Sequence, residues 1–136
     1  MRFQWRRRSL YAFFALLSAI GLLLYIIPDS NTVEDQAQRL GTREFTPATW
    51  AKATDLQRGE MTASLLKKHD VTSLHRTQIE ALLGEPTGYF DYDTNPAYFV
   101  GPKTVESMYG KGYLLVFLAN KTNGEIDSVI FFPEVE

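Results

Sequence analysis

Two histidines and an aspartate stand close together near the middle of the chain, where they could serve metal or acid–base chemistry. They are His69, Asp70 and His75, in a sequence of 136 residues that has no third histidine and no cysteine. Zinc sites need three or four ligands and a supporting shell of hydrogen bonds. Two histidines six residues apart around a helix break share no face. We therefore predict no metal site or catalytic centre here, and expect exposed polar residues at a junction between helices.

Residues 91–95, D-Y-D-T-N, copy the first half of a calcium-binding loop. The sixth position of such a loop needs glycine because the chain turns sharply there, and the twelfth is a bidentate glutamate. Here the sixth position is Pro96, whose φ is fixed at about −65°, and the twelfth is Pro102. A calcium hand is therefore excluded, and we expect a polar loop between Pro86 and the first strand.

Other catalytic motifs do not emerge from the sequence. The serines lie outside any G-x-S-x-G context, and the glycines around Lys103 and Lys111 match no phosphate-binding loop. The absence of cysteine also excludes disulfides, thiolate metal sites and a lipid-bearing N-terminal cysteine. The sequence predicts neither an enzyme nor a bound cofactor or metal.

Aromatic side chains between Pro86 and the last strands are the most suggestive feature for binding. Tyrosine offers a large contact area at low entropic cost and is enriched at binding surfaces. The same residues could instead fill the core of a small sheet domain. The candidate partner surface consists of Tyr89, Phe90, Tyr92, Tyr98, Tyr109 and Tyr113.

Residues 9–28 are uncharged and predict a membrane-spanning helix. A helix of that length covers about 30 Å, the thickness of the hydrocarbon core of a bilayer. Its apolar residues lie on every face, whereas a soluble amphipathic helix shows a polar stripe. The predicted anchor includes Leu10, Phe13, Leu16, Leu23 and Ile26.

Three arginines that precede this segment, Arg6, Arg7 and Arg8, set the expected topology. Positive charges favour the cytoplasmic side, so residues after the span are expected outside. The predicted protein crosses the inner membrane once, with a cytoplasmic N-terminus, a periplasmic or otherwise extracytoplasmic domain, and the lipid bilayer as one partner. A cleaved signal peptide remains the alternative, although the segment lacks a good cleavage site.

The expected organisation is a basic tail at 1–8, a signal anchor at 9–28, a linker at 29–45 and one domain at 46–136. The linker has turn chemistry and room for at most a turn or two of exposed helix. From Asp29 onward the chain carries 10 basic and 16 acidic residues. An acidic domain argues against nucleic acid as a partner.

Helical signals occupy the first half of the domain. Thr46 followed by Pro47 is a helix start, with a capping hydroxyl and proline at the first helical position. Gly59 predicts a break or bend before a second helical stretch. A further helix begins between residues 72 and 77 and ends at Gly84, a glycine cap that Pro86 reinforces.

Strand signals follow at about residues 98–101, 113–119 and 126–132. Asn123-Gly124 predicts a tight hairpin turn between the last two strands. That turn would pair Leu118 with Val129, Phe117 with Ile130 and Val116 with Phe131. Apart from the membrane helix, the predicted fold is α+β, with two helices and then a three-stranded antiparallel meander.

Several of these segments resemble the SmpA/OmlA family. The resemblance lies in Met61 with Leu65-Leu66, in I-E-A-L-L-G-E-P at 79–86, in Y-F-V-G at 98–101, and in Y-L-L-V-F-L followed by a turn and I-D-S-V-I. The family includes the small subunit of the bacterial outer-membrane β-barrel assembly machinery and has a fold similar to a β-lactamase-inhibitor-protein repeat. Two features differ, because the chain lacks the family's lipid-bearing cysteine and has Ser73-Leu74-His75 where the family usually has Gly-Met-Thr.

The resemblance implies a protein-binding module, an accessory in bacterial envelope assembly or maintenance with another envelope protein as partner. One alternative is an inhibitor or sensor of an extracytoplasmic enzyme. Another is a structural subunit of a membrane complex, in which the predicted span itself makes the contact.

Overall fold

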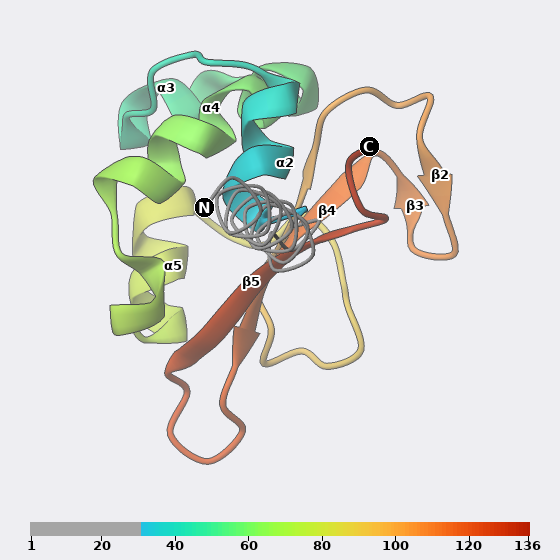
Figure 1. Cartoon of the computed structure of the whole chain (residues 1–136). Helices are drawn as coiled ribbons and strands as arrows, with labels where there is room; N and C mark the ends of the chain where they lie inside the picture. The colour runs from blue at the N-terminus through green and yellow to red at the C-terminus, as the bar shows by residue number, and fades with distance from the viewer. Residues whose placement is uncertain (1–30) are drawn as a thin grey trace, which may run out of the picture. The chain divides into compact units, whose positions relative to one another are not determined.

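The computed structural model describes residues 31–136, which form an α+β domain with a helical layer on one face of a sheet (Figure 1). The helices are α2 (Val33–Leu40), α3 (Pro47–Lys52), α4 (Asp55–Lys68), the 3-10 turn η1 (Val71–Ser73) and α5 (Arg76–Leu83). The strands are β1 (Ala97–Val100), β2 (Glu106–Ser107), β3 (Gly110–Lys111), β4 (Tyr113–Ala119) and β5 (Ile126–Phe132).

Capping side chains define where the helices begin. The predicted start at Thr46 is confirmed: its hydroxyl accepts from the Thr49 backbone N–H, and Pro47 occupies the first turn of α3. Thr54 caps α4 in the same way, with a reciprocal bond from its own backbone N–H to the Gln57 side chain. α5 ends at Gly84, which has φ +83°, as predicted from the G-x-P sequence.

The break predicted at Gly59 is wrong, because α4 continues through that residue. The glycine is there for close packing and not for bending. A Cβ built at Gly59 would lie 2.8 Å from the Gly101 backbone nitrogen, so the helix and the end of β1 touch backbone to backbone. The Gly101 N–H donates to the Asp55 carbonyl at 2.7 Å, which fixes the same crossing.

β4 is the central strand of the three-stranded antiparallel sheet, which has the order β1-β4-β5. The predicted extents of β4 and β5 are confirmed, and β1 begins one residue earlier than expected. The predicted pairing of β4 with β5 is wrong by one residue, since Phe117 lies opposite Val129 and Val116 opposite Ile130.

The register differs because the hairpin turn is longer than the sequence predicted. Asn120 closes the loop: its backbone N–H donates to the Glu125 carbonyl, and its side-chain oxygen accepts from the Thr122 N–H at 2.8 Å. A register irregularity between Leu118 and Ala119 adds to the shift. Since side chains alternate along a strand, a shift of one residue exchanges the faces of β5 relative to β4.

The main core lies between the helices and one face of the sheet. Trp50 is fully buried at its centre, with its indole N–H donating to the Leu83 carbonyl at 3.0 Å. Its ring meets Phe45 and Tyr98 edge-on, at centroid distances of 5.9 and 6.1 Å. Leu115 and Phe117 of β4 pack into the same core.

α2 lies within the segment that the sequence analysis assigned to a linker. It contributes to the core through Ala37, which is fully buried, and through Gln36. The Gln36 side-chain oxygen accepts from the Val135 N–H at 2.8 Å, and Arg39 donates to the Val135 carbonyl at 2.9 Å. α2 is therefore fastened to the segment that follows β5.

The predicted membrane-spanning helix is a further correction to the predicted architecture. The longest described helix, α4, has 14 residues and extends about 21 Å, short of a bilayer core of about 30 Å. Between residues 31 and 136, no helix combines the length and the apolar character needed to cross a membrane.

The predicted span at 9–28, with Leu10, Phe13, Leu16, Leu23 and Ile26, lies outside the described residues, as do Arg6, Arg7 and Arg8. The inner-membrane location and the bilayer partner thus lack support from the structure and form no part of the function proposed below.

Candidate functional site

The second face of the sheet, which points away from the helices, carries a smaller apolar cluster. Ala97, Leu114 and Val116 are fully buried at its centre. Phe99, Leu118 and Ile130 pack around them and are only partly buried. No helix among residues 31–136 covers this face, and the covering side chains come from loops and from the end of β5.

Three aromatic rings from distant parts of the chain meet over this face. Phe90 comes from the loop before β1, Tyr109 from the β2–β3 hairpin and Phe132 from the end of β5. Their ring centroids are 5.2 Å apart for Phe90 and Tyr109, 5.4 Å for Phe90 and Phe132, and 5.5 Å for Tyr109 and Phe132. These separations are typical of favourable aromatic pairs.

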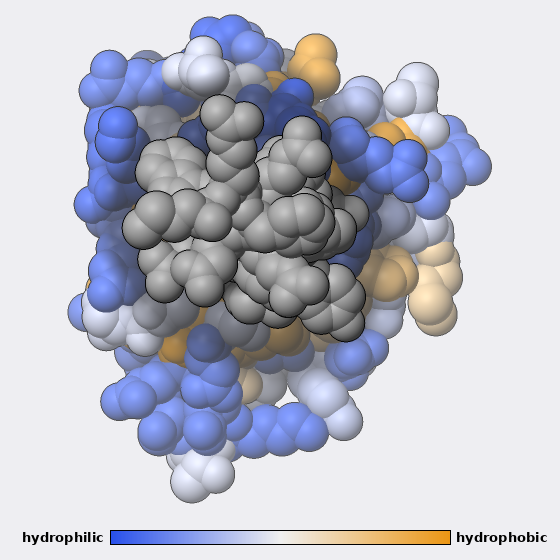
Figure 2. Space-filling view, viewed as in Figure 1, coloured by the Kyte–Doolittle hydropathy of each residue, from blue (hydrophilic) through white to orange (hydrophobic). Residues whose placement is uncertain are grey.

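The β2–β3 hairpin lies on the side of the sheet away from the helices (Figure 1). Ser107 pairs with Gly110, so Met108 and Tyr109 form its two-residue tip. Gly110 lets the tip approach the sheet, since a Cβ there would lie 2.9 Å from the Phe99 ring. Met108 is 86% exposed. Figure 2 shows hydrophobic side chains at the surface next to the lower end of this hairpin.

We name this surface the aromatic face. It is made of six side chains from the two loops and the two edge strands. These are Tyr89, Phe90, Phe99, Met108, Tyr109 and Phe132.

Hydrogen bonds to one aspartate order the tyrosines of the aromatic face. The Tyr109 hydroxyl donates to an Asp91 carboxylate oxygen at 2.8 Å, and the Tyr89 hydroxyl donates to the Asp91 carbonyl. The hydrogen bond to the Asp91 carboxylate, assisted by burial, raises the pKa of Tyr109 above its usual value. The phenol is therefore neutral and acts as a donor over the whole physiological pH range.

The six sequence-predicted partner residues fall into two groups. Tyr89 and Tyr92 are about half exposed, while Phe90 and Tyr109 are partly buried in the aromatic face. The Tyr92 ring has the Lys121 ammonium 3.5 Å from its centroid and is not part of the aromatic face.

Tyr98 and Tyr113 point into the main core instead. Tyr98 is fully buried, and its hydroxyl donates to the Gly84 carbonyl at 2.7 Å. Burial, with a contribution from Glu80, raises the pKa of Tyr98 far above its usual value. Tyr113 packs edge-on to Phe131 at 6.5 Å. Neither side chain lies on the aromatic face.

Separate structural roles are filled by His69, Asp70 and His75. His69 ends α4 and meets the Phe45 ring edge-on, whereas His75 caps α5 through its ring nitrogen and the Thr77 N–H. Asp70 accepts from the Thr72 hydroxyl. Within residues 31–136, no group of three histidine, aspartate or glutamate side chains is placed to hold a metal ion.

The calcium-like segment 91–95 serves as a loop that is tied to the sheet. Asn95 is buried, and its side-chain oxygen accepts from the Ala119 N–H at 3.0 Å. Its own side-chain N–H donates to the Phe90 carbonyl at 3.3 Å. These bonds hold the loop that presents Phe90 and Asp91.

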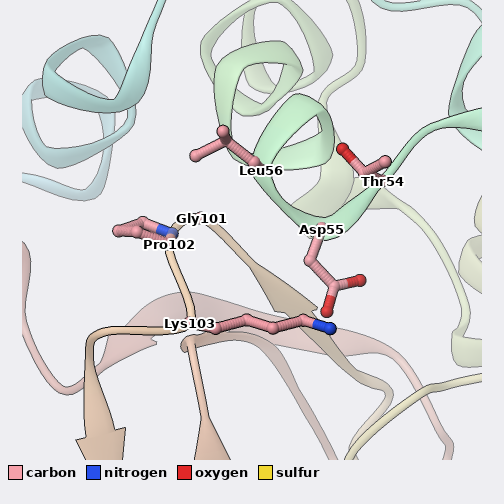
Figure 3. A pocket seen from close by; sticks show the side chains of 6 residues that line it. All are labelled: Thr54, Asp55, Leu56, Gly101, Pro102 and Lys103. Atoms are coloured by element: carbon pink, nitrogen blue, oxygen red, sulfur yellow. The ribbon is translucent and has the colours of Figure 1, made fainter.

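A cavity of about 520 Å³ lies elsewhere, between the start of α4 and the turn after β1 (Figure 3). The Asp55 and Lys103 side chains extend toward one another along one side, and Leu56 and Pro102 lie on the other. Its rim is open to solvent, and Leu56 is 54% exposed. The other polar side chain that lines the cavity is Thr54, whose hydroxyl is engaged in capping α4. The cavity therefore offers weaker support for a function than the aromatic face.

Phe99, Met108 and Phe132 belong to the aromatic face but were absent from the sequence-predicted set. Phe99 follows Tyr98 in a predicted strand whose two faces the sequence could not assign. Phe132 lay at the end of a predicted strand, where the register error hid which way it pointed. Met108 sits between two glycine-punctuated segments that were interpreted as a flexible loop. A sequence signal for this hairpin does exist, since Glu106 and Lys111 carry opposite charges and Gly110 follows the tip. The structure pairs Glu106 with Lys111 and Ser107 with Gly110.

Comparison with protein-family models, curated proteins and solved structures finds no match to this chain.

Proposed function

We propose that this protein is a protein-binding module that docks a partner through the aromatic face, and that it acts by binding and not by catalysis. The observation that carries the proposal is Met108, an 86% exposed hydrophobic side chain at the tip of a hairpin packed beside clustered aromatic rings. A single exposed apolar side chain is common on protein surfaces, but a contiguous apolar patch marks a site of interaction. Met108 stands next to the half-exposed Tyr89 and the other rings of the aromatic face, so it extends such a patch.

The construction of the aromatic face suits a partner with an apolar pocket. A few buried side chains contribute most of the binding free energy at protein interfaces, and aromatic residues and methionine are enriched in the interface core. Rings that are already packed against one another lose little entropy on binding. Phe90, Tyr109 and Phe132 meet that condition, because each ring touches the other two.

The resemblance to the SmpA/OmlA family supports the same class of function. It extends the proposal to an accessory role in the assembly of a larger protein complex. The partner is then another protein of that complex, and the contact with it runs through Met108 and its neighbouring rings.

Site-directed photocrosslinking tests the proposal. A photoreactive amino acid is placed at Met108 in the full chain, and captured proteins are identified by mass spectrometry. The matched control position is Leu56, which is also apolar and 54% exposed but lies outside the aromatic face. We expect one protein to be captured from position 108 and not from position 56. Equal capture from both positions, or capture from 56 alone, contradicts the proposal.

A further inference from the structure

Asp91 has an unusual backbone conformation within the loop that carries Tyr89 and Phe90. Its φ is +55°, and it is the one non-glycine residue with a positive φ between residues 31 and 136. Side chains other than glycine rarely adopt this region, although aspartate and asparagine tolerate it better than most. Such a conformation persists only where surrounding contacts impose it, and it is found preferentially at functional sites.

Two tyrosine hydroxyls converge on this residue, one on its backbone and one on its side chain. Tyr89 donates to the Asp91 carbonyl, and Tyr109 donates to the carboxylate oxygen Oδ1 at 2.8 Å. Tyr109 is 18 residues away and belongs to the hairpin, so this bond joins the loop to the hairpin. The two tyrosine rings also lie 6.4 Å apart, centroid to centroid.

Asp91 is the central residue of a tight turn, in which the Tyr92 N–H donates to the Phe90 carbonyl at 2.6 Å. Its carbonyl and its carboxylate each accept from a tyrosine hydroxyl in this turn. Asp93, two residues further on, is exposed and makes no hydrogen bond to a tyrosine within the described part of the chain. The two aspartates therefore differ in role although they share a loop.

We propose that Asp91 is the positioning residue of the aromatic face: its carbonyl and carboxylate hold Tyr89 and Tyr109 in place and so keep the hairpin tip, with Met108, against the loop. The proposal rests on the proposed function for its purpose, which is to order the binding surface before a partner arrives. Ordering in advance lowers the entropic cost of association. The ring contacts of Phe90 alone leave the orientation of the tyrosine hydroxyls undetermined.

The titration of Tyr109 in the full chain tests the contact directly. The seven tyrosines are labelled with ¹³C at Cζ, and the signal lost in Tyr109→Phe assigns Tyr109. Because the hydrogen bond to Asp91 raises the pKa of Tyr109, we expect Asp91→Gly to lower that pKa toward the ordinary value of about 10. The matched control Asp93→Asn removes a neighbouring charge and is expected to leave the titration of Tyr109 nearly unchanged.

A second variant separates positioning from general loss of structure. Asp91→Asn keeps an acceptor oxygen and tolerance of a positive φ, so the ring signals of Tyr89 and Tyr109 should stay close to wild type. Asp91→Gly should shift both signals while the far-ultraviolet circular dichroism is unchanged. Wild-type tyrosine signals and an unaltered Tyr109 titration in Asp91→Gly would overturn the proposal. None of these readouts needs a partner. A failure of the proposed function would appear as absent capture from position 108, whereas a failure of the Asp91 proposal would appear in the tyrosine signals alone.

Discussion

Side chains of the same type differ widely in burial in this domain, and the tyrosines show why. Tyr98 and Tyr89 both belong to the predicted partner surface, yet Tyr98 is fully buried and Tyr89 is half exposed. The sequence places Tyr89 in a loop and Tyr98 at the start of a predicted strand, but it does not show which face of the strand Tyr98 occupies. Tyr98 lies on the side of β1 that faces the helices, and Phe99 lies on the other. Which side of the strand faces the helices depends on long-range packing. The sequence could therefore predict that the segment is rich in aromatic residues, but not which of them are buried in the core and which lie on the aromatic face.

Ionisation of the Tyr98 hydroxyl is expected to lower the stability of the domain at alkaline pH. Its pKa is raised in the folded state, mainly by burial. Because the pKa of Tyr98 is higher in the folded than in the unfolded protein, the neutral hydroxyl contributes its full stabilisation below the unfolded-state pKa of about 10. This stabilisation is lost as the pH rises from that value toward the folded-state pKa. Tyr98→Phe removes the hydroxyl and its bond to the Gly84 carbonyl, at a cost of about 1 kcal/mol at neutral pH.

Urea denaturation at about pH 8 and about pH 11 measures this effect. We expect the free energy of unfolding of the wild type to fall more steeply between these pH values than that of Tyr98→Phe. Parallel falls in the two proteins would show that Tyr98 does not contribute to the alkaline transition.

At the scale of elements, local signals predicted the caps and the extents of the long strands. Thr46 with Pro47 and Gly84 act through contacts with residues a few positions away, which a sequence displays. The pairing of β4 with β5 depended on the turn instead. Asn123-Gly124 is a strong two-residue turn signal, but Asn120 offers its side chain to the Thr122 N–H and closes a wider loop. Competition between two turns cannot be decided from dipeptide preferences.

The substitution Gly59→Ala distinguishes helix propensity from packing, because the two effects change the free energy of unfolding in opposite directions. Alanine is favoured over glycine inside a helix by about 1 kcal/mol. At Gly59, however, the new methyl group would meet the backbone of Gly101 at 2.8 Å. We expect Gly59→Ala to destabilise the domain by about 1–3 kcal/mol, because the backbone at Gly101, directly after β1, must shift.

Chemical denaturation of Gly59→Ala measures this change. Lys67→Ala, an exposed substitution in the same helix, serves as the control and should change stability by less than about 0.5 kcal/mol. A more stable Gly59→Ala variant would contradict the close crossing of α4 and β1.

At the scale of the described domain, the first helix, α2, is hydrogen-bonded to the last residues of the chain. Val135 is buried, and both of its backbone polar groups are bonded to α2 side chains, the N–H to Gln36 and the carbonyl to Arg39. The sequence showed a polar segment here because Gln36 and its neighbours are hydrophilic. Their burial depends on a contact across 99 residues, which no local pattern reveals.

Gln36→Ala tests this long-range contact. The Val135 N–H would lose its acceptor in a buried place, and we expect a loss of about 1–3 kcal/mol in the free energy of unfolding. Gln38→Ala is the matched control, since Gln38 is an exposed glutamine on the same helix. Equal effects of the two substitutions on the denaturation midpoint would argue that the contact with Val135 contributes nothing.

The docking of a partner through the aromatic face is the central claim, and affinity tests it most directly. The protein captured from position 108 is purified and titrated calorimetrically against wild type, Met108→Lys and Leu56→Lys. A lysine at position 108 places a charge where an apolar anchor is expected, so we predict at least a tenfold weaker Kd, about 1.4 kcal/mol. Leu56→Lys should bind as wild type does. A Kd that is unchanged in Met108→Lys, or weakened equally in both variants, would contradict the aromatic face as the docking site.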